Sequence, residues 1–191
     1  MRTPLSRTFF ERDPVVVAPE LLGKVVVNGH LAARIVEVEA YRGEGDPASH
    51  AARGRTNRNE AMFGPAGRWY VYFTYGMHWC ANLVCAPEGT AGAVLVRAAS
   101  PLRGLTAMRA ARSTARRDVE LCQGPARLCV AMGITGDDNG ADAVRGRLRV
   151  VDDGTGSPSA PLATPRIGIS AGTGMLWRWV VAGDPHVSRL R

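Results

Sequence analysis

Two acidic residues, Glu37 and Glu39, interrupt the apolar segment 35–40, and Tyr41 follows it directly. Side chains alternate between the two faces of a β-strand, so both acids are expected on the same face as Ile35. Paired acids in a strand usually form ion pairs with nearby arginines. A carboxylate beside an aromatic ring has a chemical use as well, because hydrolysis of a nucleoside bond needs a base for water next to a surface that holds the purine.

More aromatic residues follow along the chain. The segment 70–77 carries three tyrosines and ends in Tyr75-Gly76, where the strand pattern stops, as at the tip of a hairpin. His50 lies in a polar, glycine-rich stretch, 42–67, which is too long for a simple turn, and loops of this length in a compact domain are usually functional or disordered. Each of these rings alone is more often a core residue. Beside an acid, they could stack on a flat ring.

These segments together resemble the alkyladenine (3-methyladenine) DNA glycosylase family, whose members excise damaged purines from duplex DNA. The resemblance starts at Arg7 and 21–23, includes the segments above, and continues through Leu121-Cys122-Gln123-Gly124-Pro125 to a closing segment at 183–188. Because several motifs agree in order over nearly the whole chain, the resemblance implies a single DNA glycosylase domain over residues 1–191.

The resemblance also implies roles for individual residues. Glu39 is the expected catalytic base and Arg97 helps it to hold the attacking water, with a backbone carbonyl near Ile167 completing the water site. Four residues are expected to form the pocket for the flipped base: Tyr41, His50, Tyr72 and Asn82. Asn82 would crowd the 2-amino group of normal guanine.

At the hairpin tip, the resemblance makes Tyr75 the residue that intercalates in DNA, with Met77 close by. An exposed tip aromatic suits this role, since a wedge in the minor groove fills the gap left by a flipped nucleotide. Glu37 is assigned to a supporting ion pair. His78 and His186 depart from the family pattern, which affects the expected grip on DNA and leaves the reaction unchanged.

The composition and net charge of the chain indicate which kind of partner it binds. With 191 residues, 46% of them hydrophobic, the chain can bury one core, so a single domain is the default. The protein is also expected to act as a monomer. The formal net charge is +7, and Lys24 is the only lysine among 24 basic residues. This charge suits a polyanion, because basic side chains release counterions from phosphates. The expected partner is double-stranded DNA that contains damaged purines.

Neither a metal nor a cofactor is expected. The spacing of Cys80, Cys85, Cys122 and Cys129 lacks the paired pattern and nearby histidines of a zinc site, so we interpret them as buried, reduced residues. No apolar run approaches the ~20 residues that span a bilayer, and the N-terminal segment lacks a signal-peptide core. The sequence therefore predicts a cytoplasmic, bacterial-type protein without membrane contact, associated with the nucleoid through DNA.

Seven segments rich in valine, isoleucine and aromatic residues predict strands: Val25–Val27, Ala32–Tyr41, Trp69–Thr74, Cys80–Val84, Ala93–Ala98, Leu148–Val151 and Met175–Val181. Helices are expected at 20–22 with Pro19 at the start, along an apolar stripe from Leu102 to Val119, and at 126–132 after Gly124-Pro125. Residues 152–165 predict a flexible loop. The expected fold is α+β: a curved, mostly antiparallel, open-barrel-like sheet with flanking helices and a protruding β-hairpin, similar to the C-terminal domain of formyltransferases.

Two other functions fit part of the pattern. A nucleic-acid-binding module without catalysis would share the fold, since the family fold is related to a tRNA-binding domain of formyltransferases. A hydrolase of free nucleosides would explain the acid and the aromatics, but neither the wedge tyrosine nor the net charge. Only a DNA glycosylase accounts for all of these features. A strand-cleaving lyase is not expected, because the pocket motifs contain no lysine to form a Schiff base.

Overall fold

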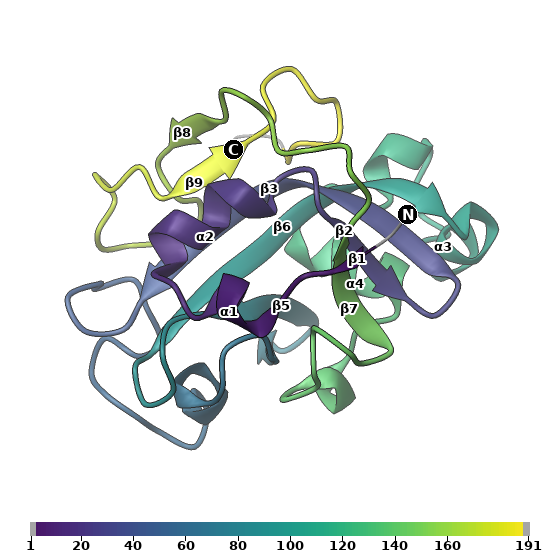
Figure 1. The fold of residues 1–191 in the computed structure, drawn as a ribbon. Coiled ribbons are helices and arrows are strands. Elements are labelled where there is room, and N and C mark those ends of the chain that lie inside the picture. Colours follow the sequence, from purple (N-terminus) through teal and green to yellow (C-terminus); the bar gives the residue numbers. More distant parts are fainter. Residues whose placement is uncertain (1–2, 189–191) are drawn as a thin grey trace.

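Two twelve-residue strands, β3 (Leu31–Arg42) and β6 (Gly92–Arg103), pair antiparallel and form the centre of the fold in the computed structural model, which describes residues 3–188. Both segments are rich in valine and alanine with few turn residues, as strands buried on both faces require. Figure 1 shows them side by side as long, curved ribbons. The rest of the sheet extends from this pair.

The sheet has the order β1-β7-β2-β3-β6-β5-β4, and β9 adds to β3 and carries β8. Every pairing among the described strands is antiparallel. The remaining strands are β1 (Thr3–Pro4), β2 (Val25–Asn28), β4 (Trp69–Thr74), β5 (His78–Val84), β7 (Leu148–Asp152), β8 (Leu162–Thr164) and β9 (Arg178–Val180). The sheet curls into a half-barrel, and helices flank it (Figure 1). The expected α+β class with a curved antiparallel sheet is therefore confirmed.

The helices are short. They are α1 (Arg7–Phe10), α2 (Pro14–Leu21), α3 (Leu105–Ala111) and α4 (Pro125–Met132), with 3-10 turns η1 (Glu60–Phe63), η2 (Asp118–Glu120) and η3 (Gly136–Asp138). The expectation of one helix along the stripe from Leu102 to Val119 is wrong. Leu102 belongs to β6, and α3 ends at Ala111.

The helix expected to begin at Pro19 begins five residues earlier. Pro14 is the first residue of α2. The Asp13 side chain accepts a hydrogen bond of 2.8 Å from the Val15 N–H, as an N-cap does. Pro19 lies inside the helix, where its missing N–H costs one helical bond. Because α2 packs against β3 and buries Val17 and Leu21, packing outweighs that loss.

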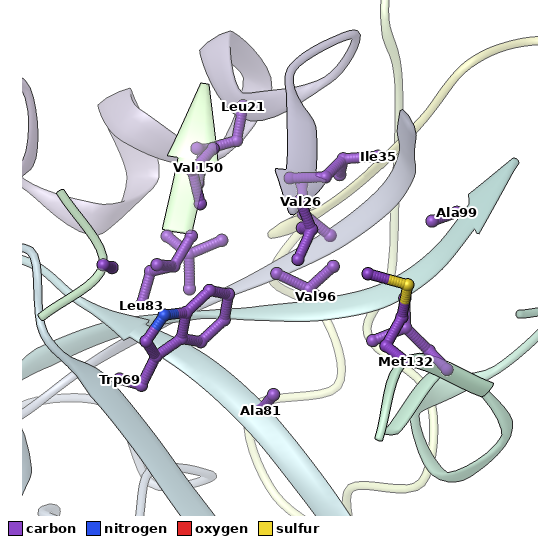
Figure 2. Packing of buried hydrophobic residues seen from close by; sticks show 14 of the residues in the cluster. Leu21, Val26, Ile35, Trp69, Ala81, Leu83, Val96, Ala99, Met132 and Val150 are labelled. Carbon is purple, nitrogen blue, oxygen red and sulfur yellow. The ribbon is translucent and has the colours of Figure 1, made fainter. Parts of the chain in front are cut away.

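The hydrophobic core lies between the curled sheet and the helices that cover it. Trp69, Leu83 and Val96 pack together from three strands, and Met132 of α4 closes one side (Figure 2). The indole Nε1–H of Trp69 donates a hydrogen bond of 2.9 Å to the Leu148 carbonyl, so the largest buried ring also satisfies its polar atom. This core fixes the strands that carry the acids.

A β-bulge at Val36 decides which way the acids point. Ile35 pairs with Ala99 and Glu37 pairs with Ala98, so Val36 is an extra residue on β3. The core-facing residues of β3 consequently change from Ala33 and Ile35 before the bulge to Val38 and Ala40 after it. The prediction that Ile35 shares a face with Glu37 and Glu39 is wrong, because strict alternation does not continue through a bulge.

The β4–β5 hairpin has the expected tip. Tyr75 and Gly76 both have positive φ, 51° and 65°, and the Met77 N–H donates to the Thr74 carbonyl at 3.2 Å. Thr74 pairs with His78, so the loop has three residues, 75–77, and the β-turn 74–77 within it has positive φ at both central positions. Glycine accepts this conformation more easily than tyrosine does. Tyr75 is 80% exposed and Met77 67% exposed. The sequence therefore predicted the tip correctly.

The long loop 42–67 is anchored by an apolar side chain, and the loop 152–165 contains a short strand. Residues 42–67 include η1, and Met62 of that turn is buried in a small apolar cluster. The prediction of an unstructured loop over 152–165 is wrong at its end, because 162–164 form β8 and pair with β9. Only three residues of β8 pair with β9, and Leu162 is half exposed. The amino-acid sequence of such a short, exposed strand shows little hydrophobic alternation.

All four cysteines are buried, as expected, and they are free. Lys24 is also largely buried, and its ammonium lies 2.6 Å from a carboxylate oxygen of Asp152. Within residues 3–188, no group of three metal-ligating side chains of the His, Cys, Asp and Glu types gathers at one place. No helix of that same stretch is long and apolar enough to cross a membrane.

Candidate active site

Glu39 is wholly buried and accepts three hydrogen bonds. Its Oε2 accepts from the Tyr41 hydroxyl at 2.7 Å and from Nη1 of Arg97 at 3.1 Å, and its Oε1 accepts from the Ile167 N–H at 2.7 Å. Charged hydrogen bonds of this kind hold a carboxylate in one orientation. Four residues that the sequence assigned to the site therefore meet at one carboxylate.

Ile167 reaches the site from the segment between β8 and β9, more than a hundred residues away along the chain. It contacts Glu39 through its N–H, whereas the sequence analysis expected its carbonyl to hold a water. The hydrogen bond explains why this backbone lies at the acid. The water-holding role of the carbonyl stays a prediction.

Glu37 is equally buried and fully paired. Its Oε1 lies 2.9 Å from Nε of Arg97 and 2.7 Å from Nε of Arg178, and Ser188 donates to both carboxylate oxygens at 2.7 Å. Burial raises the pKa of Glu37, but the charge of Arg97 and the hydrogen bonds of Arg178 and Ser188 outweigh it and leave this pKa below its ordinary value. The predicted supporting ion pair is confirmed.

The two acids and two guanidiniums form a buried cluster whose charges sum to zero. Arg97 bridges the acids, with Nε on Glu37 and Nη1 on Glu39. Because Arg178 also neutralises Glu37, the charge of Arg97 is available to Glu39. Arg178 of this cluster and Ser188, which donates to Glu37, were not anticipated, since nothing local to the C-terminal segment indicates a partner on β3.

A cavity of about 150 Å³ is lined in part by five aromatic side chains, and one of them, Tyr41, donates its hydroxyl to the buried carboxylate of Glu39. An engineered cavity of this volume holds benzene, so the space accepts a flat ring. The lining residues are Tyr41, Ala48, His50, Met62, Tyr70, Tyr72, Thr74, Tyr75, Asn82, Ala93, Gly168 and Ile169. All four residues expected in the base pocket are among them.

The rings on one side of the cavity hold one another in place. His50 and Tyr72 meet edge to face with centroids 4.5 Å apart, and Nδ1 of His50 shares a hydrogen bond of 2.9 Å with the Tyr70 hydroxyl. Burial raises the pKa of Tyr70 to about 12, and burial together with the charge of Arg58 lowers the pKa of His50. A neutral imidazole beside a protonated phenol leaves this wall uncharged at neutral pH.

Tyr70 was missed as a pocket residue, although the sequence carried a signal for it. It lies two residues before Tyr72 on β4, and strand alternation puts both on one face. The Tyr70 carbonyl also accepts a hydrogen bond of 3.0 Å from Nδ2 of Asn82 on the neighbouring strand β5. This bond fixes the orientation of Asn82 in the cavity wall.

A buried ion pair lies behind Tyr41. Both nitrogens at the end of Arg166 lie 2.7 Å from the carboxylate of Asp46, and neither side chain is exposed. The guanidinium lies 4.6 Å from the centre of the Tyr41 ring, within the range of a cation–π contact. With its hydroxyl on Glu39 and its ring against Arg166, Tyr41 has little freedom. No local residue pattern indicated this ion pair.

The exposed hairpin tip borders the same cavity through Tyr75. Met77 lies at the tip and is not among the lining residues, which agrees with a place beside Tyr75 and outside the pocket. Of the two histidines that depart from the family pattern, His186 is held by Asp184 at 2.9 Å, away from the lining residues.

The geometry therefore combines a buried, oriented carboxylate with an aromatic cavity for a flat ring. Comparison with known proteins agrees with this arrangement. The family model described as "Methylpurine-DNA glycosylase (MPG)" matches residues 8–185.

Curated relatives extend the match over the whole chain, and three examples share the provisional name 3-methyladenine DNA glycosylase. The one from Burkholderia lata is 54% identical over 187 residues, which cover 96% of this chain and 90% of that protein. The Streptomyces avermitilis protein is 48% identical over 198 residues, covering 100% and 93%. The Chlorobaculum parvum protein is 45% identical over 193 residues, covering 98% and 91%.

Proposed function

This chain belongs to the methylpurine-DNA glycosylase family of hydrolases, and we propose that it flips a damaged purine out of duplex DNA and hydrolyses its N-glycosidic bond. The observation that supports the proposal is the buried carboxylate of Glu39, which accepts a hydrogen bond from Tyr41, a residue of an aromatic cavity that fits a flat ring. The products are a free base and an abasic site. The enzyme acts as a monomer with one glycosylase domain.

In the proposed reaction, Glu39 accepts a proton from a water molecule as the water oxygen bonds to the anomeric carbon. The bond between this carbon and the purine nitrogen breaks, and its electron pair leaves with the base. The Tyr41 hydroxyl, Arg97 and the Ile167 N–H keep the carboxylate in place for this step. A general base within hydrogen-bond reach of its proton typically contributes 10²–10⁴-fold to a rate.

The reaction stops at the abasic site. A strand-cleaving lyase needs an amine that attacks the sugar, and the only lysine of the chain, Lys24, is paired with Asp152 and is not among the cavity residues. Cationic methylpurines leave readily because their glycosidic bond is already weakened. Neutral lesions also require protonation of the leaving base.

A first experiment compares substrates. Wild-type protein should release free base from a duplex oligonucleotide that contains one 7-methylguanine, and much less from 7-methylguanosine alone at the same concentration. Only the duplex engages the hairpin tip and presents a polyanion to a chain with a net charge of +7. Chromatography of the released base gives both rates. Equal release from both substrates would identify a nucleoside hydrolase, and binding to the duplex without release would identify a binding module.

A second experiment tests the hairpin tip. Tyr75→Ser should lower the population of flipped base in a duplex, because Tyr75 fills the vacated stack at a step where unstacking costs a few kcal/mol. The fluorescence of ethenoadenine, which stacking quenches, reports the flipping equilibrium. Excision from a single strand should change much less, since no stack needs to be held open. The same flipping constant for both proteins would exclude the wedge role and make Met77 the next residue to test.

A further inference from the structure

Arg58 lies at the edge of the aromatic cavity, on the loop that carries His50. Its guanidinium carbon is 5.9 Å from the centre of the Tyr72 ring, and the side chain is exposed. Tyr75 of the hairpin tip borders the same cavity. A flipped nucleotide with its base between the rings must therefore leave its sugar and phosphates outside the cavity, near these rim residues.

Hydrogen bonds inside the loop stabilise the backbone around Arg58. Asn59, which is almost completely buried, donates through Nδ2 to the carbonyls of His50 at 2.8 Å and Gly54 at 2.9 Å, and its Oδ1 accepts from the Thr56 N–H at 2.7 Å. These three bonds close the segment 50–59 into a compact turn. The backbone at Arg58 is consequently fixed relative to the cavity.

Arg58 forms no salt bridge within the part of the chain that the structure describes. In the same loop, Arg55 pairs with Glu60 at 2.7 Å, but no carboxylate within residues 3–188 lies at salt-bridge distance from Arg58. Its charge does reach the cavity, since it contributes to lowering the pKa of His50. At 5.9 Å the contact with Tyr72 is at the outer limit of a cation–π interaction, so the ring does not account for the position of the cation.

We propose that Arg58 binds a phosphate next to the flipped nucleotide and thereby positions this nucleotide in the cavity. The inference rests on the proposed function and adds a phosphate subsite to it. A guanidinium suits this ligand because its planar fork of donors matches phosphate oxygens in a bidentate geometry. Because Arg58 lies next to Tyr72 of the cavity and outside its lining, we expect this cation to meet the phosphate only when the nucleotide is flipped.

The experiment uses three duplexes with one 7-methylguanine: an unmodified one, and two in which an uncharged methylphosphonate replaces the phosphate on the 5′ or the 3′ side of the lesion. Equilibrium binding and single-turnover base release are measured for wild type and Arg58→Ala. On the unmodified duplex, Arg58→Ala should bind roughly ten- to a hundredfold more weakly, as loss of a charged hydrogen bond predicts. On one of the methylphosphonate duplexes, the affinity of wild type should fall by a similar factor. On that duplex, Arg58→Ala should cause no further loss of affinity.

Two variants serve as controls. Arg53→Ala removes an exposed arginine of the same loop that borders a different hollow, and it should keep the full effect of both methylphosphonates. Arg58→Lys keeps the charge without the fork and should recover part of the loss. The slope of log affinity against log salt should fall by about 1 for Arg58→Ala.

The outcomes separate the subsite from the function. The phosphate subsite is overturned if Arg58→Ala loses affinity by the same factor on all three duplexes. It is also overturned if this variant binds every duplex as tightly as wild type does. Weaker inhibition of Arg58→Ala than of wild type by free 7-methylguanine base would also overturn it, because the free base has no phosphate. Failure of wild type to release base from the unmodified duplex would overturn the proposed function, while the binding data would still decide the role of Arg58.

Discussion

Glu39→Gln should release 7-methylguanine from duplex DNA about 10²–10⁴ times more slowly than wild type, the range for loss of a general base. Glutamine keeps the shape of the side chain, and its carbonyl can still accept from the Ile167 N–H. Its amide cannot accept a proton from water. The rate under single-turnover conditions measures the chemical step directly.

Binding supplies the control for this prediction. The aromatic cavity is intact in Glu39→Gln, so its affinity for the lesion duplex should stay within a few-fold of wild type, and its thermal unfolding should show one cooperative transition. Glu60→Gln, which changes an exposed acid on the loop that carries His50, should leave the rate unchanged. Base release by Glu39→Gln at nearly the wild-type rate would refute the assignment of Glu39.

Glu37→Gln should lower the free energy of unfolding by about 3–5 kcal/mol, the usual cost of removing one partner from a buried ion pair. The variant leaves Arg97 and Arg178 buried with Glu39 as the remaining acid of the cluster, and Ser188 loses a charged acceptor. Urea unfolding measures the difference. Glu60→Gln breaks the exposed pair with Arg55 and should cost less than about 1 kcal/mol.

The effect depends on pH in a defined direction. The pKa of Glu37 is lowered in the folded protein from an ordinary value of 4.5, so its stabilisation is complete above that value and is lost as the pH falls through the folded pKa. The stabilities of wild type and Glu37→Gln should therefore converge in acid. An equal difference at pH 7 and at pH 3, or a loss below 1 kcal/mol at pH 7, would contradict the role of this cluster.

Local patterns predicted the parts of this molecule that depend on local chemistry. The apolar strands, the Tyr75-Gly76 turn and the alternation that puts Glu37 and Glu39 on one face all follow from residue type and period. The resemblance to a known family added the pocket residues Tyr41 and His50, which the structure does bring to one cavity. Residue pattern alone would have left each of them a core residue.

Three features could not be read from local pattern. The bulge at Val36 interrupts the two-residue period of β3, and no glycine marks its position. A valine can be buried on either face of the strand, so the residue pattern does not indicate the bulge. The pairing of Glu37 with Arg178 and Ser188 joins residues more than 140 positions apart, a distance over which only the folded topology selects partners. Pro19 indicated a helix start, yet the cap at Asp13 and burial against β3 determined the boundary.

The burial of the four cysteines bears on the chemistry of the damage itself. Methylated purines form when electrophilic methyl donors react with DNA, and the same reagents attack thiolates. Burial raises the pKa of Cys122 to about 12, and it raises the pKa of Cys80, Cys85 and Cys129 as well, so each stays a protonated thiol at neutral pH. Buried, protonated thiols are the least reactive form of cysteine, so we expect an alkylating exposure that damages DNA to modify these four more slowly than it modifies exposed thiols.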